Sequence, residues 1–261
     1  MPVVRSDDAQ ITYEILGAGP PVVLLHPFPA HRGIWRPVAE ELALRHRCLL
    51  PDLRGHGESE TGAGPATMQK HAADLLRVAD DGGVGRAVFI GISIGGYILF
   101  EFWRRYRERV AALVLCDTRA QADSDETRRA RMQSIADVQQ HGPDAFLDAQ
   151  VERLLGAGTR RNRPDIAAAA RVMMGKISVA GIVAALQGMA ERPDSVATLK
   201  TIDVPTLILV GDEDVVTPRA DAELMQRDIA GSRLQVISGA GHYSVFEQPA
   251  QVVRALHGFL P

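Results

Sequence analysis

The chain has 261 residues, of which 46% are hydrophobic and 23% are charged, and its formal net charge is −3. These values are ordinary for a globular protein, and the length allows one large domain or two small ones. A slightly acidic chain without a basic stripe gives no electrostatic reason to expect binding to nucleic acid.

Short apolar runs bounded by Gly, Pro and Asp recur along the chain. The run at 11–16 alternates like a half-exposed antiparallel strand. Continuous apolar runs, typical of strands buried on both faces, lie at 21–28, 46–53, 86–92, 111–117, 205–211 and 232–238. Helical patterns lie around 35–45, 67–80, 95–107, 218–229 and 248–259. The alternation predicts an α/β fold with a mostly parallel sheet, helices on both faces and a mixed edge.

The segment from about 119 to 200 breaks this alternation, because it contains four helical patterns and no strand-like run. Helices inserted between two strands of a parallel sheet lie beside the carboxyl ends of the strands, where such folds bind ligands. We therefore expect residues 1–118 and 201–261 to form the core and residues 119–200 to form a helical cap, or lid.

Two groups of arginines lie in the expected cap, at 128–131 and 160–163. We interpret them as a solvated face, with a clamp for a substrate carboxylate as the alternative. Met173, Met174 and Met189 are expected to pack between the cap helices, with the lining of a pocket as the alternative.

Signals for export, membrane insertion and metal binding are absent from the sequence. The N-terminal segment MPVVRSDDAQ is polar and acidic, and no apolar run approaches the roughly 18 residues of a membrane helix. Cys48 and Cys116 lie in apolar runs, which indicates buried free thiols in a reducing compartment. Without CxxC, HExxH or a compact His/Cys cluster, no metal site is expected. We expect a cytoplasmic protein without a membrane partner.

Ser93 lies in the middle of the apolar run VFIGISIGGYI. The residues from Gly91 to Gly95 fit G-x-S-x-G, in which a strand turns sharply into a helix and the serine occupies the strained apex. A buried strand before it and an amphipathic helix after it are the context in which this pattern marks a nucleophile. The structural alternative is a tolerated small residue whose hydroxyl bonds to the local backbone.

His242 is the histidine expected to act as the base for Ser93, since it follows the last predicted strand at the same edge of the sheet. An acid must orient it. The loop GDEDVVTP offers Asp214 among its three carboxylates, and Asp117 follows another strand. The chain order serine, acid, histidine does not separate Asp214 from Asp117.

An acyl-transfer enzyme also needs two N–H donors for the oxyanion. One is expected from Ile94, the residue after the nucleophile. The other is expected from the loop LLHPFPAHRGIW, where Pro27 and Pro29 have no N–H and Phe28 is the donor left between them. His26 is expected to brace this loop.

Five ordered segments resemble the α/β-hydrolase fold family: LLHPFP, LPDLRGHGES, GISIGGY, PTLILVGDEDVVTP and GAGHYSVFEQP. The resemblance covers the whole chain, with 119–200 as the helical cap. LVLCDTRAQAD and MAERPDS resemble the esterase-like subgroup often labelled 3-oxoadipate enol-lactonase. The resemblance implies that Asp214 rather than Asp117 is the acid, and that Asp52, Arg54 and His56 shape a loop.

Two positions depart from the family pattern. Pro27 stands where most relatives have glycine, and Ile94 stands where most have methionine. Both proposed oxyanion donors are backbone groups and survive these changes. Serine at the apex argues against haloalkane dehalogenases and epoxide hydrolases, which resemble this fold but use aspartate there.

We therefore expect a serine hydrolase that cleaves small carboxylic esters or lactones, with Ser93, His242 and Asp214 as its triad and no cofactor. The alternatives on the same triad are a cofactor-free perhydrolase or haloperoxidase and a carbon–carbon bond hydrolase. A ligand receptor on this fold would keep the triad but turn over negligibly.

Overall fold

The computed structural model describes residues 1–260, which form one eight-stranded sheet in the order β1-β2-β4-β3-β5-β6-β7-β8. The strands are β1 (Val3–Ser6), β2 (Ala9–Leu16), β3 (Pro21–Leu25), β4 (Arg47–Pro51), β5 (Ala87–Ile92), β6 (Val110–Cys116), β7 (Thr206–Gly211) and β8 (Arg233–Ile237). β1 and β2 run antiparallel to their neighbours, and all other pairs are parallel. The predicted mostly parallel sheet with a mixed edge is confirmed.

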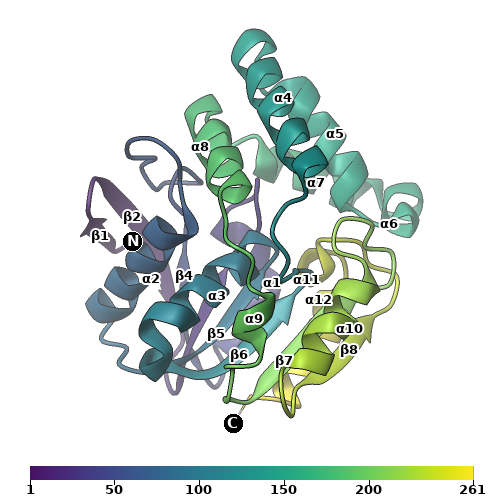
Figure 1. Cartoon of the computed structure of the whole chain (residues 1–261). Helices are drawn as coiled ribbons and strands as arrows, with labels where there is room; N and C mark the ends of the chain where they lie inside the picture. The colour runs from purple at the N-terminus through teal and green to yellow at the C-terminus, as the bar shows by residue number, and fades with distance from the viewer. Residues whose placement is uncertain (261) are drawn as a thin grey trace.

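Helices alternate with the strands of the sheet. They are η1 (Arg32–Trp35), α1 (Arg36–Leu42), α2 (Met68–Asp81), α3 (Ile94–Tyr106), η2 (Arg107–Arg109), α9 (Val196–Leu199), α10 (Arg219–Asp228), α11 (Ser244–Glu247) and α12 (Pro249–His257). α1 packs against α12, and α2 packs against α3 (Figure 1). Every residue of β5 and β7 is buried, as continuous apolar strands require when helices cover both faces of a sheet.

Two strands differ from the sequence prediction. β1 was not expected, and it pairs with β2 over Val3–Ser6. β8 was expected to be buried on both faces, but most of its residues are exposed or half-buried in alternation. The reason is its position, because β8 is an edge strand with a neighbour on one side only.

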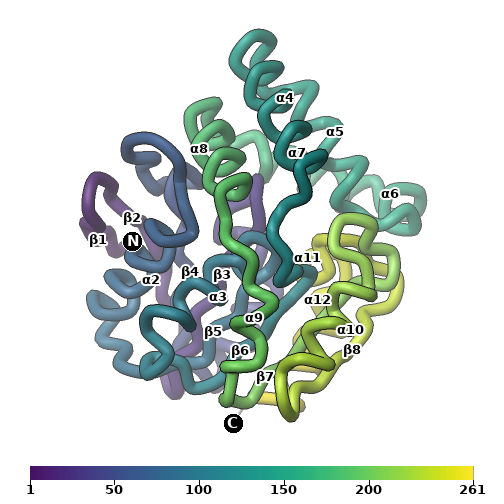
Figure 2. The backbone as a smooth tube through the Cα atoms, in the orientation of Figure 1, coloured from purple at the N-terminus to yellow at the C-terminus, as the bar shows by residue number. Residues whose placement is uncertain are grey.

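Six helices lie between β6 and β7 in the described chain, two more than the four patterns expected there, and the first five form one group. These five are α4 (Asp125–His141), α5 (Asp144–Leu154), α6 (Ala157–Asn162), α7 (Pro164–Met174) and α8 (Val179–Ala190), and we call them the cap helices. They contact one another in pairs and stand together above the sheet (Figures 1 and 2). On this arrangement we propose the division into a core of residues 1–118 and 201–261 and a cap of residues 119–200.

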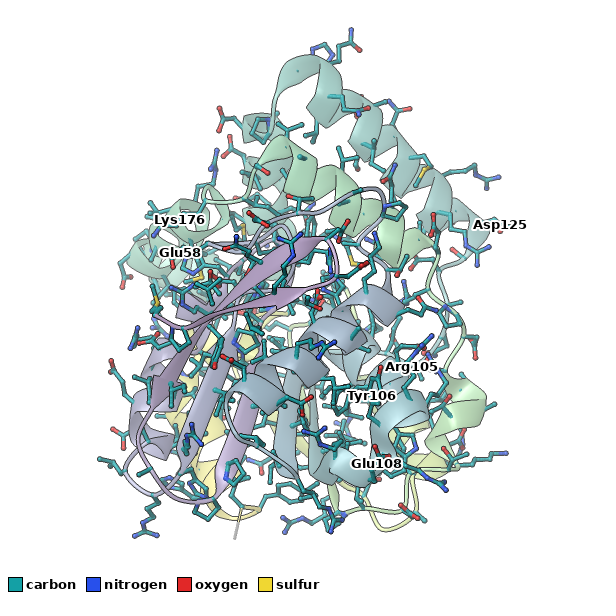
Figure 3. All side chains as sticks on the ribbon, turned by 90° about the vertical axis from the view of Figure 1, so that its left-hand side faces the viewer. Glu58, Arg105, Tyr106, Glu108, Asp125 and Lys176 are labelled. Carbon is teal, nitrogen blue, oxygen red and sulfur yellow. The ribbon has the colours of Figure 1, made fainter. Side chains whose placement is uncertain are left out.

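Side chains fill the space between the layers, while charged residues such as Glu108, Asp125 and Lys176 point outward (Figure 3). Cys48 and Cys116 are buried free thiols, as expected. Within residues 1–260, no single helix is long and apolar enough to cross a membrane. The bent pair of α7 and α8, which meet at 94°, is long and apolar enough to do so when the two helices are taken together, by length and composition only.

Candidate active site

Ser93 occupies a strained turn between β5 and α3. Its backbone has φ 56° and ψ −116°, a conformation that costs a non-glycine residue about 1–3 kcal/mol. The surroundings hold it there, since the Ser93 N–H donates to the Cys116 carbonyl at 3.0 Å and the Thr118 hydroxyl donates to the Ser93 carbonyl at 2.8 Å. The turn therefore places the Ser93 hydroxyl at the carboxyl edge of the sheet.

Glycine is required on both sides of this turn. A Cβ at Gly91 would lie 2.5 Å from the carbonyl carbon of Gly95, and a Cβ at Gly95 would lie 2.9 Å from the carbonyl oxygen of Leu25. These contacts are with backbone atoms, which cannot move aside as the end of a flexible side chain can. The G-x-S-x-G pattern thus reflects how closely α3 packs against the strands.

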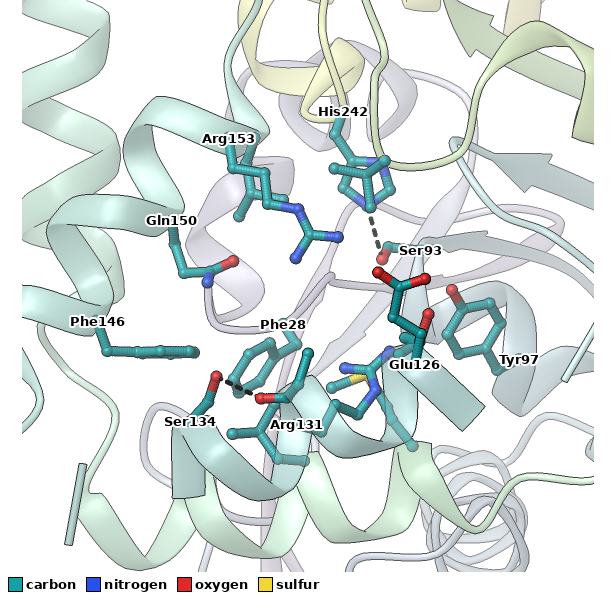
Figure 4. Close-up of a pocket in the computed structure, with 16 residues that line it drawn as sticks. Phe28, Ser93, Tyr97, Glu126, Arg131, Ser134, Phe146, Gln150, Arg153 and His242 are labelled. Atoms are coloured by element: carbon teal, nitrogen blue, oxygen red, sulfur yellow. Dashed lines mark hydrogen bonds between the residues drawn. The ribbon is translucent and has the colours of Figure 1, made fainter. Parts of the chain in front are cut away.

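The structure brings Ser93, His242 and Asp214 together from three distant parts of the chain. His242 Nε2 lies 2.8 Å from Ser93 Oγ (Figure 4), and His242 Nδ1 lies 2.8 Å from Asp214 Oδ2. All three side chains are almost completely buried. With Nδ1–H donating to the carboxylate, Nε2 presents its lone pair to the serine hydroxyl.

Asp214 is held by donors besides the histidine. The Val216 and Thr217 amides donate to its Oδ1 at 2.7 and 3.0 Å, and the Thr217 hydroxyl donates to its Oδ2 at 2.7 Å. Burial alone would raise the pKa of Asp214, but His242 and the Thr217 donors outweigh it and hold that pKa below its usual value. The carboxylate is therefore charged where it faces the imidazole.

Asp117, the other candidate acid, makes different contacts. Its carboxylate accepts from the Gly211 amide at 2.9 Å and from the hydroxyl and amide of Ser244, and it makes no hydrogen bond to His242. Burial, together with the charge of Asp214, raises the pKa of Asp117 well above its usual value. Asp117 thus joins the end of β6 to the loops after β7 and β8.

The two expected oxyanion donors lie beside the serine. Phe28 and Ser93 line one pocket, and Ile94 is the first residue of α3. Within residues 1–260, neither the Phe28 amide nor the Ile94 amide donates a hydrogen bond. The Tyr243 hydroxyl fixes the loop by donating to the Phe28 carbonyl at 3.1 Å. Two free N–H groups are what an oxyanion requires.

The pocket in front of Ser93 has a volume of about 320 Å³ and lies between the core and the cap helices (Figure 4). Its lining is Phe28, Ser93, Tyr97, Glu126, Thr127, Ala130, Arg131, Ser134, Phe146, Gln150, Arg153, Leu154, Leu186, Met189, Val216 and His242. This volume is at the lower end of the range for small-molecule sites. The pocket therefore suits a small substrate.

Hydrogen bonds tie the cap to the histidine loop. The His242 amide donates to the Leu154 carbonyl at 2.8 Å. The Glu247 carboxylate accepts from the Gly156 amide at 2.8 Å and from the Gly241 amide at 2.9 Å. One buried side chain thus holds both the segment after α5 and the residue before His242.

Four other residues singled out in the sequence lie outside the pocket lining. Asp52 accepts from the Glu58 amide at 2.9 Å, and Arg54 makes two hydrogen bonds to Asp74, at 3.0 and 2.8 Å. His56 Nδ1 donates to the Arg54 carbonyl at 3.0 Å. The fourth, His26, accepts from the Leu53 amide at 2.8 Å. These contacts shape loops and involve no pocket atom.

A model of the alpha/beta hydrolase fold family matches residues 20–249. The chain belongs to the alpha/beta hydrolase fold family. The membership predicted from the five sequence segments is confirmed.

This hydrolase is similar to a thermophilic esterase from Thermogutta terrifontis, solved with malate bound, at 39% identity and a TM-score of 0.95 over 99% of this chain and 97% of that one. The enol-lactonase from Burkholderia xenovorans LB400 is 26% identical, with a TM-score of 0.92 over 99% of both chains. A protein of Azorhizobium caulinodans, provisionally named a carbamate hydrolase, is 30% identical over 93% of this chain and 91% of its own.

Several pocket residues of this hydrolase were misjudged or missed from its sequence. Arg131 lines the pocket, although a solvated face was expected for it. Met189 packs in the buried core as expected and also lines the pocket. Gln150 and Arg153, one turn apart on α5, were not singled out at all. Their side chains become recognisable only when the cap places α5 above Ser93.

In the described part of the chain, residues 1–260, no group of three or more His, Cys, Asp or Glu side chains could hold a metal ion.

Proposed function

We propose that this protein is a serine hydrolase of small carboxylic esters or lactones, with Ser93 as nucleophile, His242 as base and Asp214 as the orienting acid. One observation carries the proposal: His242 lies 2.8 Å from Ser93 Oγ through one ring nitrogen and 2.8 Å from Asp214 through the other. The names of the related esterase and enol-lactonase support the same reaction class.

In the first half of the proposed reaction, Ser93 Oγ attacks the carbonyl carbon while His242 Nε2 takes the hydroxyl proton. The carbonyl π electrons move to oxygen, and the amides of Phe28 and Ile94 donate to that oxyanion. Asp214 stabilises the imidazolium through Nδ1–H. The tetrahedral adduct then expels the alkoxide, which takes the proton from Nε2 and leaves an acyl-enzyme.

In the second half, His242 takes a proton from water as the water oxygen attacks the acyl carbon. The new adduct expels Ser93 Oγ, which recovers its proton from Nε2, and the carboxylic acid leaves. Every proton passes through one ring nitrogen. The short contact between Nε2 and Oγ therefore serves both halves.

A p-nitrophenyl ester series from acetate to octanoate tests the proposal. We expect multiple turnovers by the wild type, and a fall in kcat on the order of a millionfold in Ser93→Ala. The pocket volume of about 320 Å³ favours the short esters of the series. Circular dichroism spectra of both proteins control for folding.

Retention of turnover in a folded Ser93→Ala would reject the mechanism. A wild type that releases one equivalent of nitrophenol or none would reject a simple esterase. Assays with acetate and peroxide would then test the perhydrolase alternative on the same residues.

A further inference from the structure

Arg153 and Gln150 project from one face of α5 into the pocket. Figure 4 shows both side chains directed into the space in front of Ser93. Within residues 1–260, neither side chain makes a hydrogen bond, and Arg153 has no ion pair. Polar groups that line a pocket and have no protein partner are available to a ligand.

The neighbouring guanidinium groups differ from Arg153 because each has a carboxylate. Arg131 Nε and Arg192 Nη1 both lie 2.6 Å from Asp123 oxygens. One carboxylate thus serves two cations, and Arg153 adds a guanidinium that has no carboxylate partner of its own.

Glu126 also lines the pocket; like Arg153 it is exposed, and the two side chains lie beyond ion-pair distance of each other. Partial loss of hydration, followed by the charges of Arg131 and Arg119, lowers the pKa of Arg153 below its usual value, and Tyr97 and Asp214 oppose this only in part. An added anion would offset both the lost hydration and the repulsion.

The backbone beside Arg153 is held to the histidine loop. Its neighbour Leu154 accepts a hydrogen bond from the amide of His242 at 2.8 Å. A guanidinium offers two parallel N–H donors that fit a carboxylate. A substrate anion held by Arg153 would therefore lie on the cap side of the pocket while its carbonyl carbon lies at Ser93.

We infer that Arg153 binds a carboxylate carried by the substrate, with Gln150 as a further donor, so that the preferred substrates are anionic esters or lactones. This inference rests on the proposed hydrolysis at Ser93. Apolar lining residues, among them Phe146 and Leu186, offer a surface for the short carbon chain between the substrate's carboxylate and its ester carbonyl. Arg153 is a specificity-determining residue and takes no part in bond making.

Matched pairs of substrates test the inference and locate the carboxylate. Monomethyl succinate against methyl pentanoate places the charge on the acyl side, and 4-acetoxybenzoate against phenyl acetate places it on the alcohol side. We expect Arg153→Gln to lower kcat/KM for the anionic member of one pair by about 10- to 100-fold, the range for a hydrogen bond to a charged group. The neutral member should change little, and Arg153→Lys should retain part of the preference.

Glu126→Gln is the matched control, since it removes the opposite charge from the same pocket. We expect it to raise kcat/KM for the anionic substrate relative to the neutral one. Equal losses on both members of each pair in Arg153→Gln, or no loss on either, would overturn the inference.

A binding measurement separates this inference from the proposed function. Calorimetry of monomethyl succinate with folded Ser93→Ala, with and without Arg153→Gln, measures recognition without turnover. Binding that Arg153→Gln abolishes supports the inference even if ester turnover does not depend on Ser93. Binding that is indifferent to Arg153→Gln overturns the inference, and Ser93-dependent turnover of neutral esters then leaves the proposed function standing.

Discussion

Replacing Asp214 by asparagine tests which of two buried carboxylates orients the base. The side chain keeps its size, but His242 Nδ1–H loses the charged acceptor that lies 2.8 Å away. The new amide donates to Nδ1, so the ring proton moves to Nε2, where it faces Ser93 Oγ and blocks proton acceptance. The same exchange in a serine-protease triad lowers kcat about 10⁴-fold, or about 5.5 kcal/mol in the activation barrier. We expect a loss of that order.

Asp117→Asn is the matched control for this experiment. Asp117 is as buried as Asp214 and lies at the same edge of the sheet, but its partners are Gly211 and Ser244. We expect kcat of this variant to stay close to that of the wild type. The assay is kcat on a short p-nitrophenyl ester at pH 8, with circular dichroism to show that both variants fold. A larger loss in Asp117→Asn than in Asp214→Asn would refute the assignment of the acid.

Two further predictions concern stability. Burial lowers the pKa of His26, His56 and His71 to about 3. In the unfolded chain the same rings bind a proton near pH 6.5. The free energy of unfolding should therefore fall as the pH drops from 6.5 towards 3, by about 1.4 kcal/mol per pH unit for each ring. His71→Leu should remove one such increment, measured by urea unfolding at pH 7 and pH 5.5, and an unchanged pH dependence would contradict this. Gly91→Ala should destabilise the fold by more than about 2 kcal/mol, since its Cβ would meet backbone atoms at 2.5 Å. Gly85→Ala, whose Cβ meets nothing within 4 Å, should not destabilise it, and equal melting temperatures for the two variants would contradict the steric argument.

The fold could be predicted from the sequence because its signals are local. Each buried parallel strand is a continuous apolar run, and most of the longer helices between strands have a helical pattern. The turn at Ser93 is equally local, since the glycines that permit it lie within two residues of the serine. β8 was misjudged because its exposure depends on its being at the edge of the sheet, which the apolar run does not encode.

The choice of acid and the lining of the pocket depend on tertiary contacts. Asp117 and Asp214 follow adjacent strands of the sheet, so chain order alone left both open. His242 bonds to Asp214 because the loop after β8 places its ring beside the loop after β7. Arg153 was missed because its significance comes from the packing of α5 over Ser93, and nothing in its immediate sequence distinguishes it from a surface arginine.

The contacts of Glu247 affect how substrates can enter and leave. Its carboxylate holds the amides of Gly156 in the cap and Gly241 in the histidine loop, and the His242 amide is bonded to Leu154. Lifting this end of the cap would pull the imidazole away from Ser93. Entry and exit that leave the base aligned must therefore use side-chain rotations at the pocket mouth or movement of the cap's far end. The end of α5 therefore helps to hold His242 in position. Loosening it should reduce turnover even where no residue touching the substrate is changed.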